Sequence, residues 1–353
     1  MDLSNLSRGT GEWLSGTGPE SDLVMSSRIR LARNLDGHPF LSKANSRRRT
    51  AIESQVGEVI DEATDEFGLT FLRLKPLNAI DRCVLMERHL ISREHAFSKG
   101  DRGVAFNAAE DVAIMVNEED HLRLQALRSG FQLRETWREM DEIDTRLEER
   151  LGYAYDEQYG YLTACPTNAG TGLRASVMLH LPALVMTQQM DKVFQAVTKI
   201  SLAVRGLYGE GTQALGDFYQ ISNQITLGKT ETEIIDNISD IIPQIIDYER
   251  KVRQTLLESK RTILEDKIWR AYGTLSTARI ISSKETLENL SLVRLGLNLE
   301  ILPDLTQNMI NDLFILTQPG HLQKLHGEEL ESMERDVARA DFIRNYLDPT
   351  SER

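Results

Sequence analysis

Arginine and carboxylate side chains gather in stretches of this sequence that are typical of strands and turns. Guanidinium groups bind anions and carboxylates accept protons, so these stretches are candidates for a charged active site. Arg28 and Arg30 are two positions apart in an alternating segment, so they point to the same side of a strand. An exposed strand arginine is usually solvated, however, and one such position alone establishes no function.

Three further segments carry similar residue types. Asn117-Glu118-Glu119-Asp120-His121 precedes Arg123, Cys165-Pro166-Thr167-Asn168 precedes Arg174, and a glycine-rich turn holds Arg205 and Glu210. The turn lacks both the G-x-x-x-x-G-K-[ST] and the G-x-G-x-x-G pattern of phosphate-binding loops. Each feature also has an ordinary structural explanation: a plain acidic turn, a small buried cysteine, or, for His89, a packed histidine. Spacing alone therefore proves no enzyme.

The elements that must position these residues follow from hydrophobic periodicity. Alternation predicts strands over 24–35 and 173–181. Short apolar runs bounded by polar turns predict buried strands over 83–86, 103–106 and 112–116. Apolar residues at helical spacing predict helices over 47–67, 132–151 and 188–203. The first part of the chain is therefore predicted to mix sheet and helix.

The C-terminal part is predicted to be all helical. A capping box from Thr230 to Glu233 begins a long helix, in which we expect Pro243 to introduce a kink. A second capping box, Ser282 to Glu285, follows, and the helical pattern continues to Tyr346. We therefore expect a flexible, glycine-rich leader over 1–20, an α+β domain over 21–255 and a helical domain over 256–353.

Composition narrows the class of protein. The 353 residues include 41% hydrophobic and 27% charged residues, as in ordinary globular proteins. The net charge of -13 argues against direct nucleic-acid binding. No run of 18 apolar residues predicts a membrane span, and the polar N-terminus does not resemble a secretory signal. Two cysteines, Cys83 and Cys165, form neither a disulfide framework nor a zinc motif, which favours a cytoplasmic location.

The ordered combination of motifs is more specific than any one of them. Four segments, taken in order, resemble the ATP:guanidino phosphotransferases, which include the arginine and creatine kinases. They are the segment from Val24 to Asn34, the Asn117–His121 run, the segment from Cys165 to Ser176 and the turn from Arg205 to Glu210. The resemblance covers about residues 22–255. It implies an α+β phosphagen-kinase-like fold, with an antiparallel sheet and flanking helices, followed here by the C-terminal helical domain.

The resemblance also implies how ATP would be bound. The family's phosphate-binding arginines correspond to Arg28, Arg30, Arg123, Arg174 and Arg205. Phosphoryl transfer depends mainly on positioning and charge stabilisation, which the guanidinium fork supplies to phosphate oxygens. Magnesium would be held mainly by the phosphates and water, without a protein metal site. The family's adenine-stacking histidine corresponds to His89.

The phosphoryl acceptor implied by the family is a guanidinium group, which is a poor nucleophile while charged. Two carboxylates can fix its plane and remove a proton as the N–P bond forms. The matching residues are Glu119, which we expect to be the base, and Glu210, the orienting partner. Cys165 matches the family's reactive cysteine, whose thiolate would steer the guanidinium without forming a covalent intermediate.

Two features favour an arginine side chain of a protein as the acceptor. The first motif begins at Val24, so we expect no counterpart of the helical domain that precedes the catalytic domain in metabolite kinases. In addition, about a hundred helical residues follow the catalytic region. This arrangement resembles the bacterial protein-arginine kinases. Their allosteric phosphoarginine motif is matched from Arg335 and Asp336 to Ala340. The alternative explanation is a helix face with charged residues at i,i+4 spacing.

The same resemblance implies partners: a zinc-finger activator protein, a Clp-type chaperone–protease that degrades marked substrates during stress, and a second copy of the chain in a homodimer. Two other functions remain open. The chain could phosphorylate free arginine, or it could be a non-catalytic adaptor that binds phosphoarginine.

Overall fold

A central antiparallel sheet organises the protein. The computed structural model describes residues 10–206 and 214–348. Eight strands follow the order β2-β3-β4-β5-β1-β8-β10-β9, and every pairing is antiparallel. The strands are β1 (Val24–Arg33), β2 (Thr70–Arg73), β3 (Gly103–Phe106), β4 (Val112–Val116), β5 (Leu122–Ser129), β8 (Leu173–His180), β9 (Leu202–Gly206) and β10 (Phe218–Asn223). The predicted α+β class is confirmed.

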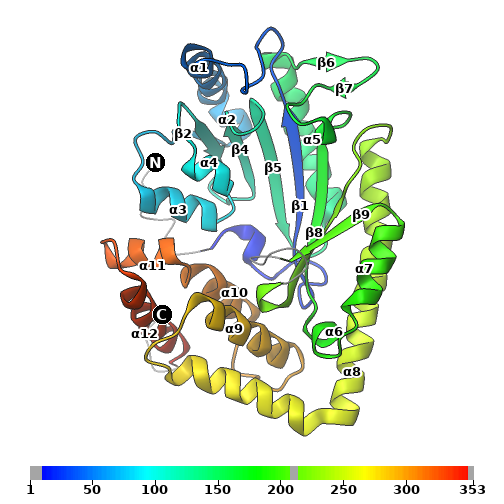
Figure 1. The fold of residues 1–353 in the computed structure, drawn as a ribbon, viewed down its shortest axis with the longest axis vertical. Helices are drawn as coiled ribbons and strands as arrows, with labels where there is room; N and C mark the ends of the chain where they lie inside the picture. Colours follow the sequence, from blue (N-terminus) through cyan, green and yellow to red (C-terminus); the bar gives the residue numbers. More distant parts are fainter. Residues whose placement is uncertain (1–9, 207–213, 349–353) are drawn as a thin grey trace.

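The two faces of the sheet differ because side chains alternate along each strand. On β1, Ile29 and Leu31 are fully buried on one face, while Arg28 and Arg30 lie on the other. Helices α1 (Ser46–Glu62), α5 (Leu133–Leu151) and α8 (Glu231–Thr277) contact the apolar face. Figure 1 shows β1 and β8 in the middle of the molecule, with α8 along one side.

A second, smaller core covers only one flank of the other face. Helices α3 (Ala79–Glu87) and α4 (Arg93–Phe97) contribute to it, and Val84, Leu85, Val104, Phe106 and Met115 are among its buried members. This core lies over β3 and β4. The arginine-bearing strands β1 and β8 are therefore left outside this apolar cover.

Short elements connect the main ones. They are α2 (Thr64–Phe67), the hairpin of β6 (Tyr155–Asp156) and β7 (Gly160–Tyr161), α6 (Pro182–Met186), α7 (Met190–Lys199), and three 3-10 turns, η2 (Glu12–Leu14), η3 (Pro166–Asn168) and η4 (Leu215–Asp217). The predicted helix over 188–203 thus ends at Lys199, because β9 begins at Leu202.

The C-terminal part is helical, as predicted. It contains α9 (Ser283–Asn298), α10 (Gln307–Leu316), α11 (Pro319–His326) and α12 (Ser332–Leu347). The capping box of Thr230 and Glu233 is present at the start of α8. The expected kink at Pro243 is wrong. The helix turns instead at Lys260, which has φ -141° and ψ 30°, and Figure 1 shows the change of direction.

Two further predictions are corrected. Residues 83–86 belong to α3 and not to a strand, since the Asn78 side chain caps this helix by accepting from the Asp81 N–H. The leader is not flexible where the structure describes it. Trp13 and Leu14 are buried, and the Asn311 side chain donates to the Leu14 carbonyl at 2.7 Å. Apolar contact fixes this part of the glycine-rich segment. Residues 1–9 of the predicted leader lie outside the described range.

The helical part is joined to the sheet part through α3. The Glu87 carboxylate accepts hydrogen bonds from the backbone N–H groups of Gly320 at 2.7 Å and His321 at 3.0 Å, and contacts the His321 ring nitrogen at 2.8 Å. All these groups are buried. Between the same two helices, Lys324 pairs with the more accessible Asp81. Within residues 10–206 and 214–348, no helix is long and apolar enough to span a membrane.

Replacing Glu87 by alanine should lower the free energy of unfolding by about 2–4 kcal/mol, because two backbone donors of α11 and a buried ring lose their acceptor. Urea titration would measure the change. Asp81→Asn breaks a more accessible ion pair between the same helices and should cost about 1 kcal/mol or less. Equal losses in the two variants would contradict the importance of the Glu87 contact.

Candidate active site

Antiparallel pairing brings five arginines from distant parts of the sequence onto one face of the sheet. They are Arg28 and Arg30 on β1, Arg123 on β5, Arg174 on β8 and Arg205 on β9. Arg30 is the Cα partner of Arg174, and Arg123 is the partner of Ala32. Arg205 pairs with Gln220 of β10, which in turn pairs with β8. The structure therefore places the five predicted phosphate-binding residues on one surface, which we call the arginine face.

The arginine face carries positive charge that its own groups do not neutralise. Burial, together with repulsion from Arg123 and Arg174, lowers the pKa of Arg28 to about 10. Burial and the same repulsion hold the pKa of Arg30 well below its usual value. Burial, with Arg205 and Arg123, lowers the pKa of Arg174 to about 10. Among the described residues, the Nε atoms of Arg28, Arg30 and Arg174 are buried without a hydrogen-bond partner. Such a surface is suited to a polyanion.

Glu118 is the carboxylate most closely engaged with this face. It accepts from Arg123 at 2.9 Å and from the Ser92 hydroxyl at 2.6 Å. Burial opposes its ionisation, but Arg123 and these hydrogen bonds leave its pKa below the usual value. Glu118 therefore holds Arg123 in place as a fixed negative charge.

An aromatic hollow borders the arginine face. His89 follows α3 with a left-handed φ of 61°, and its ring meets Trp13 edge-on at 5.1 Å between centroids. Trp13, Arg28, Leu127 and Met178 also line this hollow. Burial, with a contribution from Arg28, lowers the pKa of His89 to about 3, so the ring is neutral near pH 7. A neutral aromatic ring beside a surface of buried arginines is suited to stacking on a nucleotide base.

Gln125 connects this hollow to the arginine face. Its side-chain nitrogen donates to the His89 carbonyl, and its side-chain oxygen accepts from Arg28. The fully buried amide thus fixes Arg28 relative to His89.

Two of the three predicted acceptor-side residues, Glu119 and Cys165, lie next to residues that Asp120 connects. The buried Asp120 carboxylate accepts from the Ala164 N–H at 2.6 Å, next to Cys165, and from the Asn34 side chain. Glu119 lies 3.5 Å from Arg123, and its side chain is 46% exposed. Burial and the neighbouring Asp120 raise its pKa. The Cys165 sulfur lies 3.0 Å from the Thr167 hydroxyl. Glu210 lies outside the described residues.

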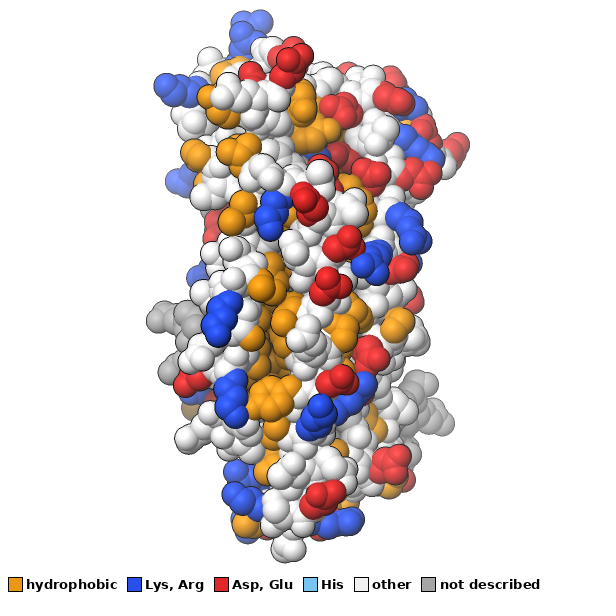
Figure 2. Space-filling view, turned by 90° about the vertical axis from the view of Figure 1, so that its right-hand side faces the viewer, with side chains coloured by type: hydrophobic (Ala, Val, Ile, Leu, Met, Phe, Trp, Pro, Cys, Tyr) orange, Lys and Arg blue, Asp and Glu red, His pale blue; other side chains and the backbone are white. Residues whose placement is uncertain are grey.

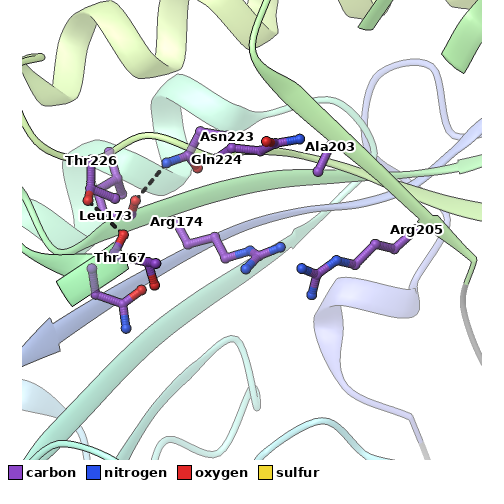
Figure 3. A pocket seen from close by; sticks show the side chains of 9 residues that line it. Thr167, Leu173, Arg174, Ala203, Arg205, Asn223, Gln224 and Thr226 are labelled. Carbon is purple, nitrogen blue, oxygen red and sulfur yellow. Dashed lines mark hydrogen bonds between the residues drawn. The ribbon is translucent and has the colours of Figure 1, made fainter. Parts of the chain in front are cut away.

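A polar pocket of about 440 Å³ opens beside the arginine face, between β8, β9 and the segments 167–168 and 223–226. Figure 3 shows Arg174 and Arg205 extending toward one another along it, with Thr167 and Thr226 on one side. Arg174 also donates to the Ser222 hydroxyl at 3.0 Å. The pocket therefore combines two of the predicted phosphate-binding arginines with the loop that carries Cys165.

Arg335 and Asp336 lie elsewhere, on α12 in the helical part (Figure 1). Arg335 donates to the Leu330 carbonyl at 2.6 Å, while Asp336 accepts from the buried Arg339. Arg339 also donates to the carbonyls of Thr317 and Ile281. The structure does not bring these two predicted residues to the arginine face.

Three residues of the candidate active site, Glu118, Gln125 and Trp13, were not predicted from the sequence. Glu118 was inside the recognised acidic run, and Gln125 is two positions from Arg123 on the same strand face, so both had a signal. Trp13 had none, because its position beside His89 depends on tertiary contacts of a glycine-rich segment.

Comparison with known proteins identifies the family. Residues 51–252 match the ATP:guanido phosphotransferase C-terminal catalytic domain, and residues 261–353 match the protein-arginine kinase McsB C-terminal domain. A protein-arginine kinase of Moorella thermoacetica is 49% identical over 97% of this chain and 99% of its own length. That of Bacillus subtilis is 45% identical over 95% and 93%. The chain belongs to the protein-arginine kinase family.

Solved structures agree with this family and its fold. Lombricine kinase, at 25% identity and a TM-score of 0.58, covers 72% of this kinase and is itself covered to 71%. The duplicated taurocyamine kinase of Schistosoma mansoni, with bound transition state analog components, has 27% identity and a TM-score of 0.60. That match covers 70% of this kinase and 35% of the duplicated chain. The sheet described here is therefore a phosphagen-kinase sheet.

Arg30→Met should raise the melting temperature of the ligand-free kinase, because it removes a buried charge that three arginines repel. The free energy of unfolding should rise by about 1–2 kcal/mol. Added ATP should stabilise the variant less than the wild type. Thermal unfolding with and without ATP would measure both effects.

Arg33→Met is the matched control on the same strand. Arg33 is buried on the opposite face and pairs with Asp144 at 2.7 Å. Its replacement leaves the Asp144 carboxylate buried without a partner charge, which should lower the free energy of unfolding by about 3–5 kcal/mol. A fall in stability for Arg30→Met as large as that of the control would refute the idea that the arginine face is under electrostatic strain.

Proposed function

We propose that this chain transfers the γ-phosphoryl group of ATP to arginine side chains of proteins. The observation that carries the proposal is the arginine face, where five guanidinium groups lie on one side of the sheet. Among the residues that the structure describes, Glu118 is the one carboxylate hydrogen-bonded to them, and it already holds Arg123. The names of the full-length relatives support a protein as the acceptor.

In this proposal the triphosphate lies across the arginine face and the adenine ring stacks on His89. Arg28 and Arg30 bind the phosphates from β1, while Arg174 and Arg205 bind them from the pocket side. Within the described ranges, no group of three or more histidine, cysteine or acidic residues could hold a metal ion. Magnesium, which would neutralise phosphate charge, is proposed from the family resemblance to be held mainly by the phosphates and water.

The acceptor guanidinium is proposed to enter beside Glu119 and Cys165. One of its nitrogen atoms forms a bond to the γ-phosphorus as the bond to the bridging oxygen of ADP breaks, and the nitrogen loses a proton to Glu119. The raised pKa of Glu119 makes this carboxylate a better base than an ordinary one. The Cys165 sulfur would orient the guanidinium, together with Glu210 from beyond the described residues.

The wider role is proposed from the family resemblance. Phosphorylated arginines would mark proteins for Clp-type proteolysis under stress, a zinc-finger protein would activate the kinase, and the chain would work as a homodimer. Arg335 and Asp336 would form an allosteric phosphoarginine site on α12. A cytoplasmic location is supported by the two free cysteines, Cys83 and Cys165.

The deciding experiment measures acid-labile phosphate from γ-labelled ATP on casein and on free arginine. Phosphate on nitrogen hydrolyses in acid, whereas phosphate on serine or threonine survives. We expect acid-labile label on casein, located at arginine by mass spectrometry. Label on free arginine alone would make the chain a metabolite kinase. Label on neither, with an activator fraction present, would favour the adaptor alternative.

Glu119→Gln should reduce transfer at least about a hundredfold while leaving the Kd for ATP within about threefold, because an amide cannot accept the proton but keeps the side chain's shape. Transfer is measured by label on casein and ATP binding by calorimetry. Glu94→Gln changes an exposed acidic residue near Glu119 and should affect neither quantity. An equal loss of ATP affinity and transfer in Glu119→Gln would exclude the base role.

A further inference from the structure

A small, mainly apolar depression lies at the end of the sheet where β9 begins and β10 ends. Asn223 lines both this depression and the polar pocket. Beyond it, the depression is lined by Ile200 and Ile225, which are 42% and 43% exposed. Single exposed apolar residues are common on proteins, but two isoleucines that share a depression beside a catalytic pocket form a small binding surface. We call these two residues the apolar rim.

Local hydrogen bonds fix the rim in this exposed position. The Thr226 hydroxyl donates to the carbonyls of Thr167 and Ala169, in the loop that follows Cys165. This contact ties the segment after β10 to the catalytic pocket, and leaves Ile225 and Leu227, on either side of Thr226, exposed. The Ile225 side of the rim is therefore tied to the loop that lines the pocket.

The strand beside the rim is an edge strand. β9 ends the sheet order, and among the described residues it pairs with β10 alone. Ala203 and Arg205 of β9 line the catalytic pocket. An extended peptide added to an edge strand places alternate side chains on the same face as those of its neighbour. A peptide along β9 would thus point side chains into the pocket.

We propose that extended, unfolded segments of substrate proteins dock along β9, with an apolar side chain on Ile200 and Ile225 and the acceptor arginine in the pocket beside Arg174. This inference rests on the proposed function and names how that site selects its substrates. Leu202, at the rim end of β9, is three residues from Arg205, or about 10 Å along an extended strand. The favoured apolar residue should therefore lie about two to four positions from the arginine.

The closeness of the rim to the pocket, which share Asn223 as a lining residue, argues for this occupant. Free arginine fills only the pocket and does not reach the rim, whereas a polypeptide that presents its arginine must pass over neighbouring surface. Segments exposed in unfolded proteins carry apolar residues that folded surfaces hide. Figure 2 shows the side of the molecule with α7 and the first half of α8, where apolar side chains gather in a strip between charged ones.

The test uses the full-length kinase, γ-labelled ATP and synthetic glycine–serine peptides that contain one arginine. One set carries leucine two, three or four positions before or after the arginine, and the reference peptide carries serine instead. We expect kcat/KM about tenfold higher for the best leucine peptide, mainly through a lower KM. Ile200→Ser and Ile225→Ser should each reduce this preference, with kcat and the rate on the serine peptide unchanged.

Ile263→Ser provides the matched control. Ile263 is 60% exposed on α8 and lines a separate hollow with Met186 and Lys260, so its replacement should leave the preference intact. Equal kcat/KM values for all peptides, or a preference that survives both rim substitutions, would overturn the docking proposal while the proposed activity stands. No acid-labile label on any peptide or on casein would overturn the proposed activity, and the docking proposal with it.

Discussion

Repulsion among like charges on one face of a sheet is the constraint to which the rest of the structure responds. Arg28 and Arg30 are crowded by Arg123 and Arg174, and burial and mutual repulsion lower their pKa values. Such an arrangement is unfavourable without a ligand and persists only where other contacts hold it. The opposite face of β1 supplies these contacts, because Ile29 and Leu31 are fully buried in the main core.

The helical part shares its support with the arginine face. Glu87 holds the start of α11, and two residues later the His89 carbonyl accepts from Gln125, which also binds Arg28. Between them, the buried Arg88 forms an ion pair with Glu110. The C-terminal end of α3 is therefore a rigid element common to both parts. The regions that match the two family domains meet near Lys260, where α8 changes direction.

The sequence predicted the parts of this arrangement that depend on local pattern. Alternation along 24–35 and 173–181 located β1 and β8, and the ordered motifs named the five arginines that pairing brings together. The sequence pattern did not predict the correct secondary structure where a short apolar run is compatible with both a strand and a helix. A four-residue apolar run at 83–86 suits a strand or a helix equally, and capping by Asn78 selects the helix.

Tertiary contact also explains the other misses. Glycine-rich composition suggested a loose leader, yet Trp13 packs against His89 and Leu14 is tied to α10. Pro243 looked like the natural place for a bend, but the helix turns at Lys260, a residue type with ordinary helical preference. No single-residue signal marks that position.

The two adjacent glutamates suit two different arginines. One is the protein's own Arg123, and the other is the acceptor arginine of the proposed reaction. Glu118 is paired with Arg123 and its pKa is lowered, so it is a stable counter-charge and a poor base. Glu119 is more exposed and its pKa is raised, so it accepts a proton more readily. Neighbouring carboxylates whose pKa values are pushed apart commonly divide structural and acid–base roles. Under the proposed function, the acceptor arginine would give its proton to Glu119, while Arg123 stays paired with Glu118.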